Sequence, residues 1–321
     1  MRFIYIFFLL FISCSNKNDI QTNLTGFVYG TTYKIIFFSE NDFNYKSEID
    51  SLFNVIDNSM STYKSTSIIS KINNNIDTKV DFHFEYVFNI SKEIFHKTYG
   101  LFDPSIGPLV NYLNFGPSNN YNNYNDLNKL VGFNKFELVD SKVIRPSNSF
   151  LDFNAIAKGY SVDVISDFLD INNISNYLVE VGGEIKVKGN NLKKDTQWRV
   201  GLDKPRFDGL QQELYKSFSL INKSMATSGI YRKFKIDSLG NRYAHIINPK
   251  TGYSSKTNIL SVTVIADNCI VADAYATALH LMTLDEIEDF IKINNDISVF
   301  VIYLDENNEM KDISFNKFPI I

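Results

Sequence analysis

The chain contains few of the residues on which common enzyme signatures depend. Its 321 residues include only two cysteines, Cys14 and Cys269, and four histidines. Two cysteines are too few for a disulfide framework, and histidines scattered along the sequence do not predict a zinc cluster. The chain also lacks a Gly-x4-Gly-Lys-Ser/Thr loop, a Gly-x-Ser-x-Gly elbow and a His-Glu-x-x-His motif. Cys269 has no base identifiable from the sequence, so we interpret it as structural.

Neither sign of charge dominates the chain. It has 32 Lys and Arg residues against 36 Asp and Glu residues, a net charge of −4. Nucleic-acid binding requires clustered positive charge, so we expect no nucleic-acid partner. A hydrophobic content of 44% with 15 Gly and 7 Pro is typical of a globular protein. This composition excludes collagen-like chains, low-complexity disorder and a membrane protein with many spans.

The first 25 residues have the pattern of an export signal followed by a linker. A positively charged start precedes ten apolar residues, 3–12, which as a helix would measure about 15 Å, too short to span a bilayer. Cys14 directly follows Ser13, an arrangement that resembles the bacterial lipobox. We predict a signal peptide at residues 1–13, a lipidated linker at 14–25 and one folded domain at 26–321. The alternative is that Cys14 is an ordinary core cysteine.

Hydrophobic periodicity predicts both strands and helices along the rest of the chain. Helical spacing predicts helices at residues 47–60, 82–98, 157–169 and 272–282. Runs of β-branched and aromatic residues predict strands at 28–38, 177–181, 185–188, 198–202, 217–221, 260–265 and 299–304. Residues 114–128, rich in Asn and Tyr, are expected to form an exposed loop. Because strands and helices do not alternate strictly, the pattern favours an α+β fold.

Short polar segments among apolar ones are the remaining candidates for chemistry. Asp273 and Thr277 are four residues apart, so they lie on one face of a predicted helix, between four alanines. Two oxygen ligands on a rigid surface suit a hard cation that keeps water and holds phosphate oxygens. In the alternative, Asp273 offsets the helix dipole and Thr277 bonds back to a carbonyl.

Three further segments could position a ligand. Asp152 and Lys158 lie in a Gly/Ala-rich strand-to-helix turn, where they could bind a polar edge and a phosphate. In the alternative, Asp152 caps the helix and Lys158 is solvated. Residues 226–229, Ala-Thr-Ser-Gly, predict a small-residue turn that permits close backbone approach. His245 precedes a tight turn at 248–252, and a lone histidine there is structural unless something places it at a phosphate.

Nine short motifs follow one another between residues 30 and 282. They are Gly-Thr-Thr-Tyr at 30–33, Met-Ser-Thr-Tyr at 60–63 with Ser67, Phe-Asp-Pro-Ser-Ile-Gly at 102–107, Leu-Asp to Gly-Tyr at 151–160, Val-Gly-Gly-Glu-Ile at 181–185, Trp-Arg-Val-Gly-Leu at 198–202, Ala-Thr-Ser-Gly at 226–229, His-Ile-Ile-Asn-Pro-Lys-Thr-Gly at 245–252, and Ser-Val-Thr-Val at 261–264 with Ala-Asp at 272–273 and Ala-Leu at 278–279. In this order they resemble the ApbE family, the bacterial FAD:protein FMN transferases. Each motif is weak alone, but nine in a fixed order are specific.

The resemblance implies a T-fold-like α+β architecture whose two closely joined subdomains bind FAD between them, with one Mg²⁺ at the pyrophosphate. Asp273 and Thr277 match the side-chain ligands of the metal, and Ala155 matches the position that supplies a backbone carbonyl. His245 matches the histidine that assists proton transfer. Ala276 stands where some relatives carry a second aspartate. The positions that match flavin contacts are Tyr29, Tyr63, Leu101, Phe102, Asp103, Asp152, Lys158 and Ile247.

The reaction implied by the resemblance transfers the FMN part of FAD to a Ser or Thr hydroxyl of a target protein and releases AMP. Mg²⁺ would bridge pyrophosphate oxygens, and His245 could accept the hydroxyl proton. Two alternatives use the same site: hydrolysis of FAD to FMN and AMP, and flavin binding without turnover. A structural envelope lipoprotein is disfavoured, because nothing structural demands Asp273, Thr277 and His245 together.

The resemblance also implies a location and a partner. Many family members are exported lipoproteins, so we expect a chain in the cell envelope, anchored to a membrane by lipid on Cys14 and facing the periplasm. The expected partner is a flavin-accepting protein, such as a subunit of a sodium-pumping quinone reductase or of a related electron-transport complex.

Overall fold

The computed structural model describes residues 19–117, 124–208, 213–231, 234–236, 242–255 and 257–319. The predicted signal peptide and Cys14 lie outside these residues. Within them, none of the helices combines the length and the apolar character that crossing a bilayer requires.

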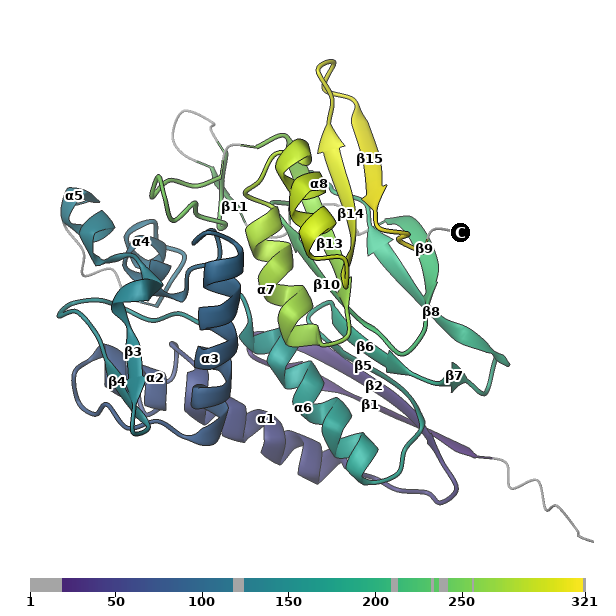
Figure 1. The fold of residues 1–321 in the computed structure, drawn as a ribbon. Coiled ribbons are helices and arrows are strands. Elements are labelled where there is room, and N and C mark those ends of the chain that lie inside the picture. The colour runs from purple at the N-terminus through teal and green to yellow at the C-terminus, as the bar shows by residue number, and fades with distance from the viewer. Residues whose placement is uncertain are drawn as a thin grey trace, which may run out of the picture.

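An antiparallel sheet of eight strands forms the centre of the molecule (Figure 1). Its order is β1-β2-β5-β6-β10-β13-β14-β15, so strands that are neighbours in the sheet also follow one another along the chain. Every other element is an insertion between two of these strands. The strands are Ile20–Val28 (β1), Thr31–Ser39 (β2), Asn176–Val181 (β5), Glu184–Lys188 (β6), Ser224–Gly229 (β10), Ile259–Ala266 (β13), Ser298–Leu304 (β14) and Met310–Phe315 (β15).

The longest insertion, between β2 and β5, forms a helical lobe beside the sheet and ends in the long helix α6. It contains α1 (Lys46–Met60), α2 (Ile68–Asn73), α3 (Phe82–Lys97), η1 (Pro104–Ile106), α4 (Gly107–Tyr112), α5 (Tyr124–Leu127), η2 (Asn128–Leu130), η3 (Phe133–Lys135), β3 (Glu137–Val139), β4 (Lys142–Ile144) and α6 (Ala157–Ile171). Later insertions supply β7 (Asn190–Asn191), β8 (Thr196–Asp203), β9 (Leu214–Leu220), β11 (Phe234–Ile236), β12 (Arg242–Ala244), α7 (Cys269–Leu279) and α8 (Leu284–Ile293). This mixture confirms the expected α+β class.

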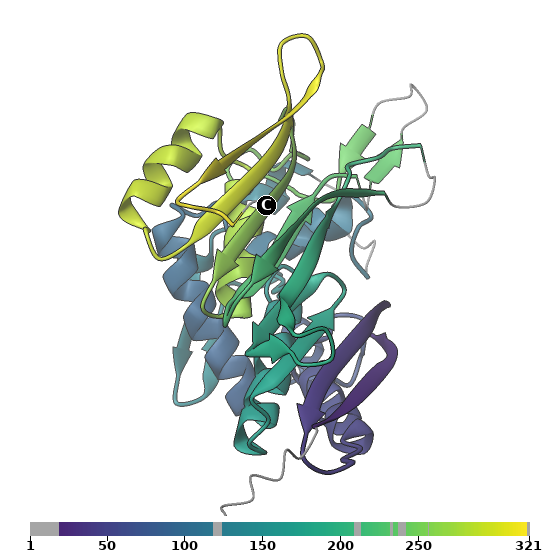
Figure 2. The ribbon, with the colours of Figure 1, turned by 90° about the vertical axis from the view of Figure 1, so that its right-hand side faces the viewer.

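Two layers cover opposite faces of the main sheet (Figures 1 and 2). Alternation along β14 shows the division, because Val299 and Val301 belong to the core under α7. Phe300 and Ile302, which alternate with them, belong to a second core together with side chains of β8 and β9. Side chains of period two therefore fill two cores, one under the helices and one under the small sheet β7–β8–β9.

Part of the segment expected to be a linker belongs to the main sheet. β1 pairs with β2 along the whole hairpin, from Ile20 opposite Ser39 to Val28 opposite Thr31. Because β1 is an edge strand, its polar side chains can face water without cost. Residues 20–25 are therefore folded structure rather than linker.

Three further expectations need correction. Residues 226–229 are not a turn but the end of the central strand β10, and their small size fits the close contact with α7. The helix expected at 272–282 is α7, which begins earlier, at Cys269, and ends at Leu279. The loop expected at 114–128 contains the short helix α5, and its residues 118–123 lie outside the described part of the chain.

Candidate active site

A buried cluster of one amine and two carboxylates lies where α6, α7 and β6 meet. The Lys158 Nζ is 2.6 Å from Glu184 Oε1 and 3.9 Å from Asp273 Oδ2. The Glu184 and Asp273 side chains are 4% and 6% exposed, whereas the Lys158 side chain is 30% exposed. Lys158 is therefore not simply solvated, because it reaches the surface from between two buried acids.

The cluster carries an excess of negative charge. Burial opposes the charged ammonium, but Asp273 and Glu184 together hold the pKa of Lys158 above its usual value. Burial raises the pKa of Glu184 to about 7, although Lys158 acts in the opposite direction. Since one ammonium does not balance two ionised carboxylates, the charge of the cluster can be balanced by a proton on Glu184 or by a further cation.

A two-residue turn aims Glu184 into this cluster. Gly182 and Gly183 join β5 to β6 with φ angles of +62° and +102°, in the left-handed region that the tight primed hairpin turns require. A Cβ added at Gly182 would lie 2.9 Å from the Thr31 side chain and 3.4 Å from Lys158 Cδ. The backbone N–H of Gly183 donates to Glu180 Oε1 at 2.7 Å, which fixes the turn. The order Gly-Gly-Glu thus brings Glu184 to Lys158.

Asp273 joins α7 to the beginning of α6. Its Oδ2 accepts a hydrogen bond of 3.0 Å from the backbone N–H of Gly159, in the first turn of α6. A Cβ on Gly159 would lie 2.4 Å from the Cys269 carbonyl oxygen, so only glycine permits this helix crossing. Asp273 therefore does offset a helix dipole, as one interpretation of the sequence expected, but the helix is α6 rather than α7.

Thr277 follows Asp273 by one helical turn and faces the sheet. Its Oγ1 lies 3.0 Å from Ser228 Oγ on β10. No group of three His, Cys, Asp or Glu side chains suited to a metal ion occurs among the described residues. A cation here would instead be held by Asp273, the Thr277 hydroxyl and a backbone carbonyl such as that of Ala155, in the turn before α6. So few protein donors suit a cation that keeps water and phosphate oxygens as its other ligands.

A second group of predicted residues gathers in the helical lobe. The backbone N–H of Asp152 donates to the Pro104 carbonyl at 2.8 Å, which places Asp152 beside the segment 101–105. Asp152 Oδ1 accepts a hydrogen bond of 2.8 Å from the Asn154 N–H. Asp152 therefore orders the turn that leads to α6 and does not cap the helix itself.

Asp103 is buried in a network made by its own loop. It accepts hydrogen bonds from the Ser105 N–H at 2.8 Å, the Ser105 hydroxyl at 2.5 Å and the Phe133 N–H at 3.3 Å. Burial raises the pKa of Asp103 to about 6, against the effect of these hydrogen bonds. Leu101 is half-buried, and the Phe102 side chain lies in the core. A ligand contact at Phe102 would therefore come from its backbone.

His245 and Tyr63 both contact Phe115. The Tyr63 hydroxyl donates to the Phe115 carbonyl at 3.3 Å, and the His245 ring lies edge-on to the Phe115 ring with centroids 6.5 Å apart. Tyr63 is 61% exposed, so most of its ring is available to a ligand. Ile247 is buried against Leu109, which docks the loop after His245 on the helical lobe.

The tight turn predicted after His245 is confirmed. The Gly252 N–H donates to the Asn248 carbonyl at 2.7 Å, and the Asn248 N–H donates to the Tyr253 carbonyl at 2.9 Å. Gly252 has a φ of +75°, which explains why glycine ends the motif. The turn holds the loop in one conformation behind the histidine.

Tyr29 is directed toward α1 rather than into the charged cluster. It lies in the β1–β2 turn with a φ of +52°. Its hydroxyl donates to the Phe53 carbonyl at 3.0 Å, and its ring is edge-on to the Phe53 ring with centroids 5.9 Å apart. Because the side chain already has these partners, a flavin contact at this position would come from the backbone.

The two groups of predicted residues adjoin one another. The short segment 152–158 places Asp152 in the helical lobe and Lys158 in the charged cluster. His245 links the helical lobe to the end of α7, because it acts electrostatically on the buried His280. Burial, together with His245, lowers the pKa of His280 to about 4.

The sequence interpretation assigned no role to three side chains at the site, Glu184, Ser228 and His280. The first two lie within recognised motifs, and their position is explained by strand alternation, because both face the helices. His280 lies three residues after Thr277 and is completely buried. The spacing of three residues between Thr277 and His280 is the sequence pattern that could have placed His280 beside the site.

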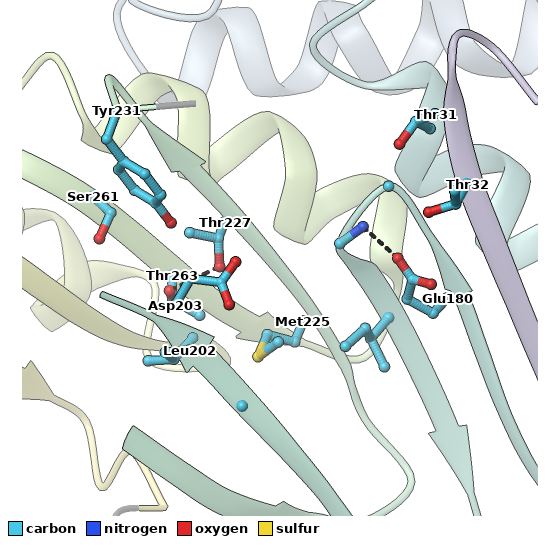
Figure 3. A pocket seen from close by; sticks show the side chains of 14 residues that line it. Thr31, Thr32, Glu180, Leu202, Asp203, Met225, Thr227, Tyr231, Ser261 and Thr263 are labelled. Carbon is cyan, nitrogen blue, oxygen red and sulfur yellow. Dashed lines mark hydrogen bonds between the residues drawn. The ribbon is translucent and has the colours of Figure 1, made fainter. Parts of the chain in front are cut away.

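The opposite face of the sheet holds a pocket of about 360 Å³ (Figure 3). Figure 3 shows Tyr231, Thr227, Asp203 and Glu180 around it. Two carboxylates and several hydroxyl groups line this pocket, and none of the described residues that line it is Lys, Arg or His. Among the described lining residues nothing would attract a pyrophosphate, whereas the cluster on the helical face contains the Lys158 ammonium.

Comparison with known proteins assigns the chain to a family. The model of the ApbE family matches residues 29–301. This chain belongs to the ApbE family. That membership confirms the resemblance read from the nine motifs.

Among curated family members, an FAD:protein FMN transferase from Vibrio cholerae is 32% identical over 85% of each chain. One from Haemophilus influenzae is 30% identical over 93% of this chain and 91% of its own. The solved flavin transferase ApbE from Vibrio cholerae superposes with a TM-score of 0.83 at 30% identity, covering 94% of this chain and 98% of its own. The apo form of the Pseudomonas stutzeri flavinyl transferase ApbE gives 0.80 at 25% identity, covering 92% and 95%.

Proposed function

We propose that this chain is an FAD:protein FMN transferase, which moves the FMN part of FAD to a Ser or Thr hydroxyl of an acceptor protein and releases AMP. One observation carries the proposal: Lys158, Asp273 and the N-terminus of the 15-residue helix α6 meet within 4 Å. The Lys158 ammonium attracts phosphate oxygens, and Asp273, fixed by its hydrogen bond to α6, offers a carboxylate to a cation that would bind them as well. The names of the curated relatives support the same activity.

A divalent cation, Mg²⁺, completes the proposed site. Without it, two buried carboxylates would repel a pyrophosphate that a single ammonium attracts. Asp273, Thr277 and the Ala155 carbonyl are the groups that would hold it. When bound, Mg²⁺ neutralises charge on the phosphate oxygens as the anhydride bond breaks.

The chain's own residues then perform positioning and proton transfer. Lys158 holds phosphate oxygens, while Tyr63, Asp103, Asp152 and Ile247 position the flavin end. The acceptor oxygen forms a bond to the FMN phosphorus, and the bond from that phosphorus to the bridging oxygen breaks, leaving its electron pair on AMP. His245 accepts the hydroxyl proton, because imidazole titrates near neutral pH.

The decisive experiment incubates the purified mature chain with FAD and Mg²⁺, with and without an acceptor domain that presents a Thr hydroxyl. Intact mass of the acceptor and chromatography of the nucleotides are the two readouts. An acceptor that gains one FMN with release of AMP supports the transferase. Free FMN and AMP without any adduct would establish a pyrophosphatase instead. FAD that stays bound and unchanged would establish a flavin-binding protein.

The proposal includes a lipid anchor at Cys14 that holds the chain at the periplasmic side of an envelope membrane. From Cys14 to the start of β1 at Ile20, an extended tether spans at most about 20 Å. The folded domain would therefore stay close to the membrane, where a quinone reductase or related electron-transport subunit could present its hydroxyl. Replacing Cys14 by Ser should release the protein from membranes and remove the lipid mass. A Cys14→Ser chain that still fractionates with membranes would refute the anchor.

A further inference from the structure

We propose that Glu184 is a positioning residue for the metal site, because it holds the Lys158 ammonium away from Asp273 and so keeps Asp273 available to a divalent cation. This inference rests on the proposed function and deepens it. It assigns a role to a carboxylate that, among the described residues, bonds neither to the Gly159 N–H nor to the Thr277 hydroxyl.

The argument starts from the position of the ammonium between two acids. The Lys158 Nζ is in hydrogen-bond contact with Glu184 Oε1 at 2.6 Å, but it is only at the limit of an ion pair with Asp273, at 3.9 Å. An ammonium and a metal ion compete for the same carboxylate lone pairs. Glu184 therefore decides which of the two Asp273 receives.

The structure makes Glu184 a strong and well-fixed partner for the ammonium. It sits directly after the Gly182-Gly183 turn and its side chain is 4% exposed. Its second carboxylate oxygen, Oε2, is buried and has no hydrogen-bond partner among the described residues. Lys158 is the ion-pair partner of Glu184 among the described residues, so the ammonium stabilises the negative charge of Glu184 in this buried position.

The loss of the Glu184 charge should close the gap between Lys158 and Asp273. A buried ammonium needs a carboxylate partner, and Asp273 is then the remaining acid within ion-pair distance among the described residues. Glu184→Gln should therefore weaken binding of the divalent cation by about 10-fold or more, the range found when outer partners of metal ligands are removed. The probe is Mn²⁺ alone, followed by its electron paramagnetic resonance signal without FAD.

The double variant Glu184→Gln/Lys158→Gln provides the discriminating measurement. If the ammonium is the competitor, its removal restores Mn²⁺ affinity to within a few-fold of the parent chain, even though a phosphate contact is lost. If Glu184 acted as a ligand or only supported the fold, the double variant would bind Mn²⁺ more weakly than Lys158→Gln alone by the full effect of Glu184→Gln. That second result would overturn the proposal.

Asp203→Asn is the matched control. Asp203, at the end of β8, is also a carboxylate, but it lines the pocket on the opposite side of the sheet and lies outside the turn that carries Glu184. Its replacement should change Mn²⁺ affinity by less than about twofold, and an equal loss in both variants would contradict the proposal. A parent chain that binds no Mn²⁺ would refute the metal site as a whole, whereas Mn²⁺ binding without rescue would refute only the role of Glu184.

Discussion

The helices α6 and α7 cap each other's first turn with an aspartate, and the two aspartates are used differently. Asp163 of α6 accepts hydrogen bonds from the Cys269 and Ile270 N–H groups at 3.0 and 2.8 Å. It also pairs with Lys186 at 2.8 Å. Asp273 of α7 accepts one hydrogen bond, from Gly159, and its lysine stands 3.9 Å away.

The difference shows how one structural device serves both stability and function. Both oxygens of Asp163 accept hydrogen bonds, and the Lys186 ammonium contacts it directly, so its charge is already paired within the fold. The described hydrogen bonds of Asp273 reach only Oδ2, and its lysine is held by Glu184 instead. Strand β6 creates the contrast, because Glu184 and Lys186 are two residues apart and both face the helices. Lys186 pairs with Asp163, whereas Glu184 pairs with Lys158 and leaves Asp273 without a close ammonium.

The largest effect should follow from Asp273→Asn. Asparagine can still accept the Gly159 N–H, so the fold is preserved, but the charge that a cation needs is gone. We expect FMN transfer to fall by more than about 100-fold, since even outer partners of metal ligands are worth about 10–100-fold. The assay is transfer at saturating FAD over a Mg²⁺ titration. Full activity with unchanged Mg²⁺ dependence would contradict the assignment of Asp273.

The next effect should come from Asp163→Asn and should concern stability. The change leaves the largely buried Lys186 without its closest carboxylate and removes charge from the cap of α7. We expect the free energy of unfolding to fall by about 2–3 kcal/mol, because Lys186 is 17% exposed and partly hydrated. Urea titration measures this loss. Transfer per folded molecule should stay within about threefold of the parent chain. A loss as large as that expected for Asp273→Asn would show that Asp163 also takes part in the reaction.

The C-terminal end of α7 supplies a test by pH. His280 is completely buried, and burial together with the nearby His245 lowers its pKa to about 4. The unfolded chain therefore binds a proton between about pH 6.5 and 4 that the folded chain does not bind, so stability falls as the pH falls through this window. His280→Phe should remove this dependence and make the protein about 2 kcal/mol more stable at pH 5, relative to the difference at pH 8.

Thermal and urea unfolding at pH 5 and pH 8 measure the effect of His280→Phe. Leu279→Met, at the buried position next to His280, is the control and should leave the pH profile unchanged, because it changes no titratable group. Asp103 acts in the opposite direction, because its pKa of about 6 makes the folded chain bind the extra proton between about pH 4 and 6. Asp103→Asn should therefore steepen the loss of stability on acidification. Identical profiles for all three variants would show that neither group controls it.

The local pattern of the sequence predicted the elements better than the contacts between them. The helices α1, α3 and α6 were predicted within two residues at each end, because their apolar faces have a clear period. The start of α7 was missed because its cap comes from Asp163, more than a hundred residues away. β10 was mistaken for a turn because its small residues reflect close packing against α7 rather than a change of chain direction.

The candidate site could be identified only through the resemblance to a family. The spacing of Asp273 and Thr277 was compatible with both a metal site and a helix cap. The contact that separates these alternatives joins Gly159 to Asp273 across 114 residues, and no local pattern contains it. The role of Glu184 likewise depends on two distances from Lys158, which only a three-dimensional structure supplies.

The smallest expected effects come from two neighbouring residues on β10 whose side chains lie on opposite faces of the sheet. Ser228 faces the helices and lies 3.0 Å from Thr277, whereas Thr227 faces the pocket and lies 2.9 Å from Thr263 Oγ1. Ser228→Ala should lower transfer by up to about 10-fold at limiting Mg²⁺, because the Thr277 hydroxyl loses the partner that orients it. Thr227→Val should cost about 1 kcal/mol of stability for one lost hydrogen bond and leave transfer unchanged. Transfer assays at limiting and saturating Mg²⁺ distinguish the two faces. Equal losses at both positions would mean that the pocket face also contributes to the reaction.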